Sequence, residues 1–313
     1  MPASSKTTTL LIGGAGFIGR ELALRLITEG RRNVVILGRS PRAFTGLLAE
    51  AKYIQGSLAN SKLVSNLLDE VDEVVDLAYS TVPKTSFDDP LFDLTTNLPR
   101  AVNLLEMASR SNLKKYVLVS SGGAVYGEAQ YLPINESHPT NPISPYGISK
   151  LVTEKYATFF NKLYGLPVII ARPGNPYGAA QVGNTVQGFV GYAIYSIRSN
   201  MPVKVFGSRG TVRDYIHIED LAGGLMRILE HGNIGATYNI GTGIGYDNLA
   251  LLEQLRVLAE SDGYGVKVEH APSRDFDVRK NVLDSGALFD DVNWSPKISL
   301  LDGLQSVWAQ ARL

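Results

Sequence analysis

The stretch Thr9-Leu10-Leu11-Ile12-Gly13-Gly14-Ala15-Gly16-Phe17-Ile18-Gly19 sets glycines between a short apolar run and a segment with helical spacing. Residues 9–12 predict a buried strand, and Phe17–Glu29 predicts the helix that follows it. Glycines at such a junction allow a tight turn and let the backbone approach a pyrophosphate at the helix start. A turn without a ligand is the alternative, but its place between the first strand and the first helix favours dinucleotide binding.

Apolar runs and helical patterns alternate beyond this junction. Strands are predicted at residues 33–37, 73–78, 115–120 and 167–171, and helices at 97–109 and 146–164. Pro99 is expected in the first turn of its helix, where proline is tolerated. Because the strands are apolar on both faces, the order predicts an α/β fold with a doubly wound parallel sheet of the Rossmann type.

The composition of the sequence changes after Arg172-Pro173. Glycine and proline become frequent, and strand and helix patterns no longer alternate regularly. We therefore expect residues 1–173 to form the dinucleotide-binding domain. Residues 174–313 should form mainly a smaller substrate-binding domain, with 212–245 returning to the first domain.

Composition narrows the classes of function. The 30 Lys and Arg residues balance 30 Asp and Glu residues, which argues against nucleic acid or an anionic membrane as partner. The chain has no cysteine, which rules out disulfides and thiolate chemistry and suits a reducing compartment. A polar N-terminus without a signal-peptide pattern, and no apolar run near the ~20 residues that span a bilayer, predict a cytoplasmic protein.

The four histidines give no sign of a metal site. His138, His217, His231 and His270 are scattered without the spacing of metal ligands. We therefore expect no metal, and a structural role for His217.

Tyr146-Gly147-Ile148-Ser149-Lys150 supplies the candidate catalytic pair. A spacing of four puts the phenol and the ammonium on one helix face. The ammonium favours ionisation of the phenol, which can then take a proton from an alcohol while hydride passes to a nicotinamide. An exposed helix pair is the alternative, which the glycine turn upstream makes less attractive.

The residue that would select the cofactor is unusual. About 20 residues after the glycine turn, an acidic side chain commonly binds the ribose of NAD. Here Gly38-Arg39-Ser40 carries no carboxylate, and Arg39 could face the 2′-phosphate of NADP instead. Taken alone, these residues lean towards NADP, with a solvated Arg39 as the alternative.

With these motifs in order, the chain resembles the extended short-chain dehydrogenases/reductases of the NAD-dependent epimerase/dehydratase group, and UDP-glucose 4-epimerase-type enzymes in particular. The resemblance extends over nearly the whole chain. Besides the glycine turn and the Tyr146/Lys150 pair, it rests on Asp76-Leu77-Ala78, Asn97, residues 120–127, 171–175, 212–217, 238–243 and 274–278.

The resemblance implies roles for individual residues. Tyr146 and Lys150 would be catalytic, with Ser121 assisting. The expected cofactor-binding residues are Gly13, Gly16, Phe17, Ile18, Gly19, Arg39, Ser57, Leu58, Leu77, Ala78, Tyr79, Asn97, Ser120, Tyr146, Lys150 and Pro173. Substrate would be bound by Asn175, Arg213, Arg274 and Asn281. The two arginines suit a diphosphate, because a guanidinium fork holds phosphate oxygens in two hydrogen bonds. NAD is the implied cofactor, with NADP left open by Gly38-Arg39.

Several positions depart from the family pattern. The Ser or Thr expected four residues before Tyr126 is Gly122, and Ser121 is the expected substitute, with Ser120 second. Ser57 replaces a common aspartate. Dehydratases carry Asp-Glu where this chain has Gly123 and Ala124, so acid–base elimination of water is not expected.

The leading hypothesis is a nucleotide-sugar 4-epimerase acting on a UDP-hexose or UDP-N-acetylhexosamine. An NADP-dependent keto-sugar-nucleotide reductase and a non-catalytic dinucleotide-binding protein are the alternatives. The modest volume of Asn281 suggests room for an N-acetyl group. The resemblance also implies a homodimer formed through the helices at 97–109 and 146–164.

Overall fold

The computed structural model describes residues 6–41, 45–183, 188–274 and 277–311. Its elements, in chain order, are β1 (Thr7–Ile12), α1 (Phe17–Glu29), β2 (Arg32–Gly38), η1 (Gly46–Glu50), β3 (Lys52–Gln55), α2 (Ser61–Asp69), β4 (Glu73–Asp76), α3 (Pro83–Asp88), α4 (Pro90–Ala108), β5 (Lys115–Val119), α5 (Gly122–Val125), α6 (Pro145–Tyr164), β6 (Val168–Pro173), β7 (Asn175–Tyr177), η2 (Ala179–Gln181), α7 (Phe189–Arg198), β8 (Val203–Phe206), β9 (Val212–His217), α8 (Ile218–His231), β10 (Thr237–Ile240), β11 (Gly245–Tyr246), α9 (Asn248–Ser261), β12 (Val268–Ala271), β13 (Lys280–Asn281), α10 (Gly286–Val292) and α11 (Leu300–Gln310).

Seven parallel strands form the main sheet, in the order β10-β6-β5-β4-β1-β2-β3. The chain starts at β1, runs outward to β3, and then crosses to β4 to build the other half. This is the doubly wound order, in which ligands bind at the carboxyl ends of the strands where the order reverses. The predicted α/β fold with a doubly wound parallel sheet is confirmed, and its switch point lies between β1 and β4.

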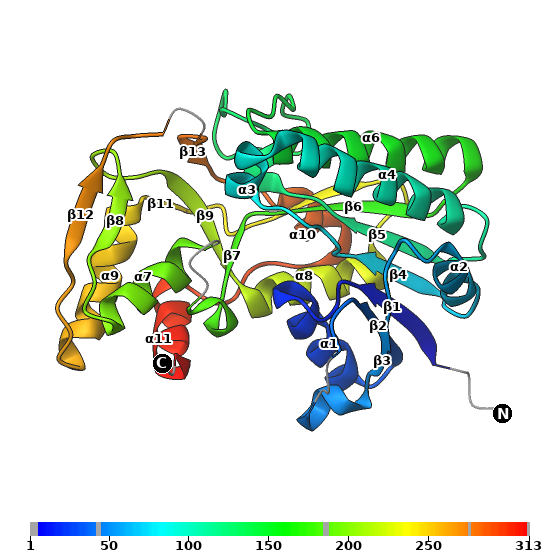
Figure 1. Cartoon of the computed structure of the whole chain (residues 1–313), viewed down its shortest axis with the longest axis horizontal. Helices are drawn as coiled ribbons and strands as arrows, with labels where there is room; N and C mark the ends of the chain where they lie inside the picture. The colour runs from blue at the N-terminus through cyan, green and yellow to red at the C-terminus, as the bar shows by residue number, and fades with distance from the viewer. Residues whose placement is uncertain (1–5, 42–44, 184–187, 275–276, 312–313) are drawn as a thin grey trace.

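Alternate residues of each strand enter two separate cores, which explains why the strands read as continuous apolar runs. Leu11 of β1 packs in one core, and Leu10 and Ile12 pack in the other. The first core also takes in α1 and α8, and the second takes in α2, α4 and α6. Figure 1 shows α4 and α6 along one face of the sheet, with α1 and α8 on the opposite face.

A third core organises much of the C-terminal part. It joins residues of α7, α9, α11, β8 and β9. In the smaller sheet β9 pairs with β7, β11 and β13. β8 and β12 form a separate two-stranded sheet. Within residues 212–245, α8 packs on α1 and β10 joins the main sheet, whereas β9 stays in the smaller sheet. The division into domains at residue 173 stays a prediction.

One sequence expectation about a helix is wrong. α4 begins at Pro90 rather than near residue 97, because Asp89 caps it by accepting a hydrogen bond of 2.8 Å from the N–H of Phe92. Pro99 therefore lies inside the helix and not in its first turn. Both Pro99 and Thr95 are exposed, so water can bond to the Thr95 carbonyl, which lacks an N–H partner at residue 99.

Candidate active site

The glycine turn joins β1 to α1 at the switch point and packs tightly. Gly13 has φ +77°, a left-handed conformation that favours glycine. A Cβ on Gly13 would lie 3.2 Å from Cα of Ala78, so the turn touches the segment just after β4. A Cβ on Gly19 would lie 2.4 Å from Cα of Gly14, and only glycine lets the helix approach the turn this closely.

The start of α1 suits an anion. Gly16 is its N-cap, no side chain caps the helix, and no acidic residue lies in its first turn. Phe17, Ile18 and Gly19 form that turn, whose N–H groups carry the positive end of the helix dipole. The local chemistry therefore fits the pyrophosphate of a dinucleotide.

Tyr146 and Lys150 come together on one face of α6. The helix is capped by Ser144, and the Tyr146 N–H donates to Oγ of Ser86 at 3.1 Å. Nζ of the buried Lys150 donates to the Val119 carbonyl, at the end of β5, at 2.9 Å. The same nitrogen lies 5.9 Å from the centre of the Tyr146 ring.

Burial dominates the electrostatics of this pair. It raises the pKa of Tyr146 to about 12, a shift opposed by a hydrogen bond with Ser121 and increased by the charge of Asp93. Burial also lowers the pKa of Lys150 to about 8, opposed by the carboxylates of Asp76, Glu154 and Asp93. Without ligand, the phenol stays protonated at neutral pH, and Ser121 favours its ionised form.

The absent hydroxyl at Gly122 has a steric cause. A Cβ there would lie 2.6 Å from Cδ1 of Leu283 and 2.9 Å from the carbonyl oxygen of Arg172. Gly123 is open by comparison. A Cβ on Gly123 would lie 3.7 Å from the side-chain amide of Asn175 and 3.9 Å from Oγ of Ser121, both ordinary contact distances. The structure thus brings Ser121 and Asn175 to one place, next to Tyr146.

Several buried polar atoms around the pair have no hydrogen-bond partner among the described residues. They include Oγ of Ser120 and Nδ2 of Asn175. Buried polar groups normally have hydrogen-bond partners, so unpaired ones gathered at one site indicate that a bound ligand supplies the missing partners.

A buried polar network next to Tyr146 and Lys150 was not predicted from the sequence. Asp93 accepts hydrogen bonds from the hydroxyls of Ser149, at 2.6 Å, and Thr81. Asn97 also donates to Asp93 and accepts from the Ser80 N–H, so it fixes the loop after β4. Ser149 directly precedes Lys150 in the sequence, but nothing in the sequence signals Asp93.

Five of the predicted cofactor residues line one small cavity of about 10 Å³, next to Asp76 and Arg100. They are Leu58, Ala78, Tyr79, Asn97 and Lys150. Leu77 directly follows β4, and Pro173 ends β6. Arg39 and Ser57 are exposed beyond β2 and β3. The Arg39 carbonyl accepts a hydrogen bond from the Gln55 side chain, and Oγ of Ser57 accepts one from the Ala59 N–H.

The expected substrate residues occupy the adjoining part of the molecule. Arg213 and Arg274 lie close enough for their charges to interact. Burial lowers the pKa of Arg213, and the charge of Arg274 lowers it further. Arg274 pairs with Asp277 at 2.8 Å and lies 3.9 Å from the centre of the Phe206 ring. Asn281 is fully buried and donates to the Gly122 carbonyl at 2.9 Å. Phe206 carried no signal in the sequence.

Other features lie outside this site. Nδ1 of His217 accepts from the Glu219 N–H at 3.4 Å and caps α8, a structural contact as expected. Across the described ranges, no cluster of His, Asp or Glu could hold a metal ion. In the same part of the chain, no helix is both long and apolar enough to cross a membrane.

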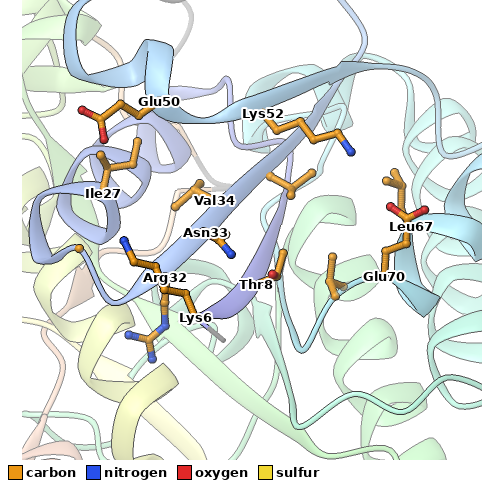
Figure 2. Close-up of a pocket in the computed structure, with 13 residues that line it drawn as sticks. Lys6, Thr8, Ile27, Arg32, Asn33, Val34, Glu50, Lys52, Leu67 and Glu70 are labelled. Atoms are coloured by element: carbon orange, nitrogen blue, oxygen red, sulfur yellow. The ribbon is translucent and has the colours of Figure 1, made fainter. Parts of the chain in front are cut away.

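A second pocket, of about 450 Å³, lies at the opposite edge of the sheet. Figure 2 shows Lys6, Thr8, Arg32 and Lys52 around it, at the amino ends of β1, β2 and β3. Because the glycine turn lies at the carboxyl end of β1, this pocket is separate from the candidate site.

Comparison with known proteins supports the geometry. Residues 9–241 match the model of the NAD dependent epimerase/dehydratase family. A putative UDP-glucose 4-epimerase of Methanocaldococcus jannaschii is 31% identical, over 95% of this chain and 96% of that protein. The UDP-glucose 4-epimerase of Mycolicibacterium smegmatis is 30% identical, over 95% and 96% respectively.

Solved structures agree. The UDP-glucose 4-epimerase of Thermotoga maritima with UDP-glucose has a TM-score of 0.89 at 30% identity and covers 97% of this chain and 98% of its own. That of Thermus thermophilus in complex with NAD has a TM-score of 0.87 at 29% identity, with the same coverage. The resemblance inferred from the motifs is confirmed, and the chain belongs to the NAD-dependent epimerase/dehydratase family.

Proposed function

We propose that the chain is a UDP-sugar 4-epimerase that uses bound NAD. The observation that carries this proposal is the placement of Tyr146, which is hydrogen-bonded with Ser121, lies near Lys150 and meets the ring of Tyr79. Tyr79 follows Ala78, the residue against which the glycine turn packs. NAD is the cofactor of the family, and the uncapped start of α1 fits its pyrophosphate. Held there, NAD would supply the hydride-accepting and hydride-donating chemistry that epimerisation at sugar carbon 4 needs.

The chain's own residues move and orient the proton. Tyr146 takes the proton of the 4-hydroxyl and gives it back after the keto sugar has turned over. The Lys150 ammonium favours the phenolate by its charge. Ser121 orients the 4-oxygen of the sugar and the phenol oxygen of Tyr146. Position 122 cannot supply this hydroxyl, because a side chain there would collide with Leu283.

Substrate would be held next to this group. The unpaired Nδ2 of Asn175 lies near Ser121, at the end of the site that faces the smaller sheet. Arg213 and Arg274 supply positive charge for the diphosphate, since guanidinium groups bind phosphate oxygens through two hydrogen bonds.

A reductase that consumes NADPH is the second candidate, favoured by the exposed Arg39 at the end of β2. The absence of cysteine fits a cytoplasmic location for either enzyme.

Interconversion of UDP-glucose with UDP-galactose, and of their N-acetylated counterparts, tests the proposal. We expect turnover without net consumption of NAD, and a loss of about 10²–10⁴-fold in kcat for Tyr146→Phe. Tyr156→Phe, exposed on the same helix, should leave the rate unchanged. Stoichiometric NADPH oxidation would favour the reductase, and binding of NAD without any turnover would favour a non-catalytic protein.

We propose further that the sugar pocket admits an N-acetyl group beside Asn281. The support for this proposal is the modest volume of the Asn281 side chain, which is buried and donates to the Gly122 carbonyl at 2.9 Å. Calorimetry with UDP-glucose and UDP-N-acetylglucosamine should give binding of both, and exclusion of the latter would contradict this.

We also propose a homodimer formed through α4 and α6, which pack side by side (Figure 1). Apolar side chains on both helices are exposed, namely Leu91, Phe92, Leu94, Ile148, Tyr156, Phe159, Leu163 and Tyr164. A patch of this kind commonly marks a protein interface. Light scattering should find a dimer that Phe159→Glu dissociates, whereas Phe289→Glu, on the exposed side of α10, should not.

A further inference from the structure

Tyr79 touches both members of the catalytic pair. It lies just beyond β4, and its ring centre is 4.2 Å from Nζ of Lys150. The ring also meets that of Tyr146 edge to face, with centroids 5.1 Å apart and planes at 79°. A single aromatic ring therefore contacts the ammonium and the phenol at once.

The contact belongs to the ring of Tyr79 and not to its hydroxyl. The hydroxyl is buried beside Ser149, and burial raises its pKa, with the charge of Asp93 adding to the shift, so it stays neutral. The π face of an aromatic ring attracts an ammonium within about 6 Å, and the attraction grows when water is excluded. Lys150 is 7% exposed, so its charge is largely desolvated.

Other groups also face Lys150, from each neighbouring element. The carboxylates are Asp76 at the end of β4, Asp93 on α4 and Glu154 on α6, and the Val119 carbonyl accepts its hydrogen bond. None of these carboxylates lies within 4.0 Å of the Lys150 ammonium as a salt bridge among the described residues. The Tyr79 ring is therefore the group that covers the ammonium at contact distance on the side of Tyr146.

We propose that Tyr79 is a positioning residue, whose ring holds the Lys150 ammonium beside Tyr146 through a cation–π contact. The inference deepens the proposed epimerase mechanism, on which its kinetic consequence rests. Because the ring favours the charged form of lysine, weakening its π face should make Lys150 easier to deprotonate. The lysine would then support the phenolate less well.

Stepwise fluorination of the ring tests this without changing its shape. Starting from Tyr79→Phe, phenylalanines with increasing numbers of ring fluorines are placed at position 79. The Lys150 pKa is followed in the cofactor-free protein by the ¹³Cε resonance of labelled lysine, assigned by its loss in Lys150→Arg. We expect Tyr79→Phe to leave the pKa nearly unchanged and the series to lower it by about one unit.

Matched measurements separate electrostatics from packing. The same fluorinated residues at Phe160, a buried ring further along α6, should leave the Lys150 pKa unchanged. In the epimerase assay, kcat should fall along the Tyr79 series with little change in KM, and its alkaline limb should move to lower pH. Tyr79→Leu should match the most fluorinated variant, and if it does not fold, the fluorinated series still decides.

The two proposals fail in distinguishable ways. A Lys150 pKa that is independent of ring fluorination overturns the cation–π role, whatever the enzyme does. Absence of epimerisation by the unmodified chain overturns the proposed function, while the lysine titration still decides the role of Tyr79.

Discussion

Gly122 and Leu283 lie so close that no side chain fits between them. A Cβ on Gly122 would come within 2.6 Å of Cδ1 of Leu283, which is fully buried, and within 2.9 Å of the Arg172 carbonyl oxygen. The side chain of Leu283 could turn away, but the backbone carbonyl could not without shifting β6. The chain thus could not carry a hydroxyl at this position in its present packing, which is why the proposed mechanism gives that role to Ser121.

Restoring the hydroxyl should therefore harm the protein. We expect Gly122→Ser to lower the free energy of unfolding by about 1–3 kcal/mol, because it overpacks a closed site. Denaturant unfolding measures this. Gly123→Ala is the control, since its Cβ would have 3.7 Å to the nearest side chain, and it should change stability far less. A Gly122→Ser variant that is both stable and more active would contradict the steric argument.

The buried ion pair behind the lysine should be costly to break. Arg172 donates from Nε and Nη2 to the Glu154 carboxylate at 3.1 and 2.6 Å, and both side chains are less than a tenth exposed. Glu154→Gln should destabilise the fold by about 3–5 kcal/mol, since it leaves a buried guanidinium uncompensated. Glu106→Gln removes an exposed partner of Arg110 and should cost less than about 1 kcal/mol. Equal effects would argue against burial as the cause.

The buried Lys150 should make stability depend on pH. Its pKa is lowered from 10.5 to about 8, chiefly by burial, so between these values the unfolded chain binds more protons than the folded one. Stability should therefore rise with pH from about 8 to 10.5, and the full penalty of about 3 kcal/mol is present below pH 8.

Lys150→Met should remove that penalty. We expect the variant to be more stable than the parent at pH 7 and the difference to shrink as the pH approaches 10.5, while turnover is lost. Unfolding of the cofactor-free proteins across this range measures both trends. Lys155→Met, exposed on the same helix, should show neither. A Lys150→Met variant less stable than the parent at pH 7 would contradict the assigned cost of burial.

Two glycines of the turn should respond differently to alanine. Gly19→Ala brings a Cβ to 2.4 Å from the Gly14 backbone and should destabilise the junction of β1 and α1. A Cβ on Gly16 would meet only the Gly13 carbonyl oxygen, at 3.2 Å, so Gly16→Ala should fold but bind NAD more weakly. Thermal unfolding and calorimetric titration with NAD separate the two effects, and tight binding by Gly16→Ala would remove this residue from the phosphate site.

The sequence by itself determined the features that depend on short-range pattern. Apolar runs on both strand faces indicated the parallel sheet, and the glycines after β1 indicated the turn. The spacing of Tyr146 and Lys150 set both side chains on one helix face, because a helix repeats every 3.6 residues. Where the pattern was interrupted, as at Pro90 and Pro99, the start of α4 was misplaced.

Only the tertiary structure decided which distant residues meet at the site. Tyr79 reaches Lys150 because the ends of β4 and β5 are neighbours in the sheet, and Asp93 reaches Ser149 because α4 packs on α6. Leu283 closes the space at Gly122 from a segment far along the chain. Such contacts depend on packing between elements, which no local periodicity encodes. They determine the pKa of Lys150 and exclude a side-chain hydroxyl from position 122.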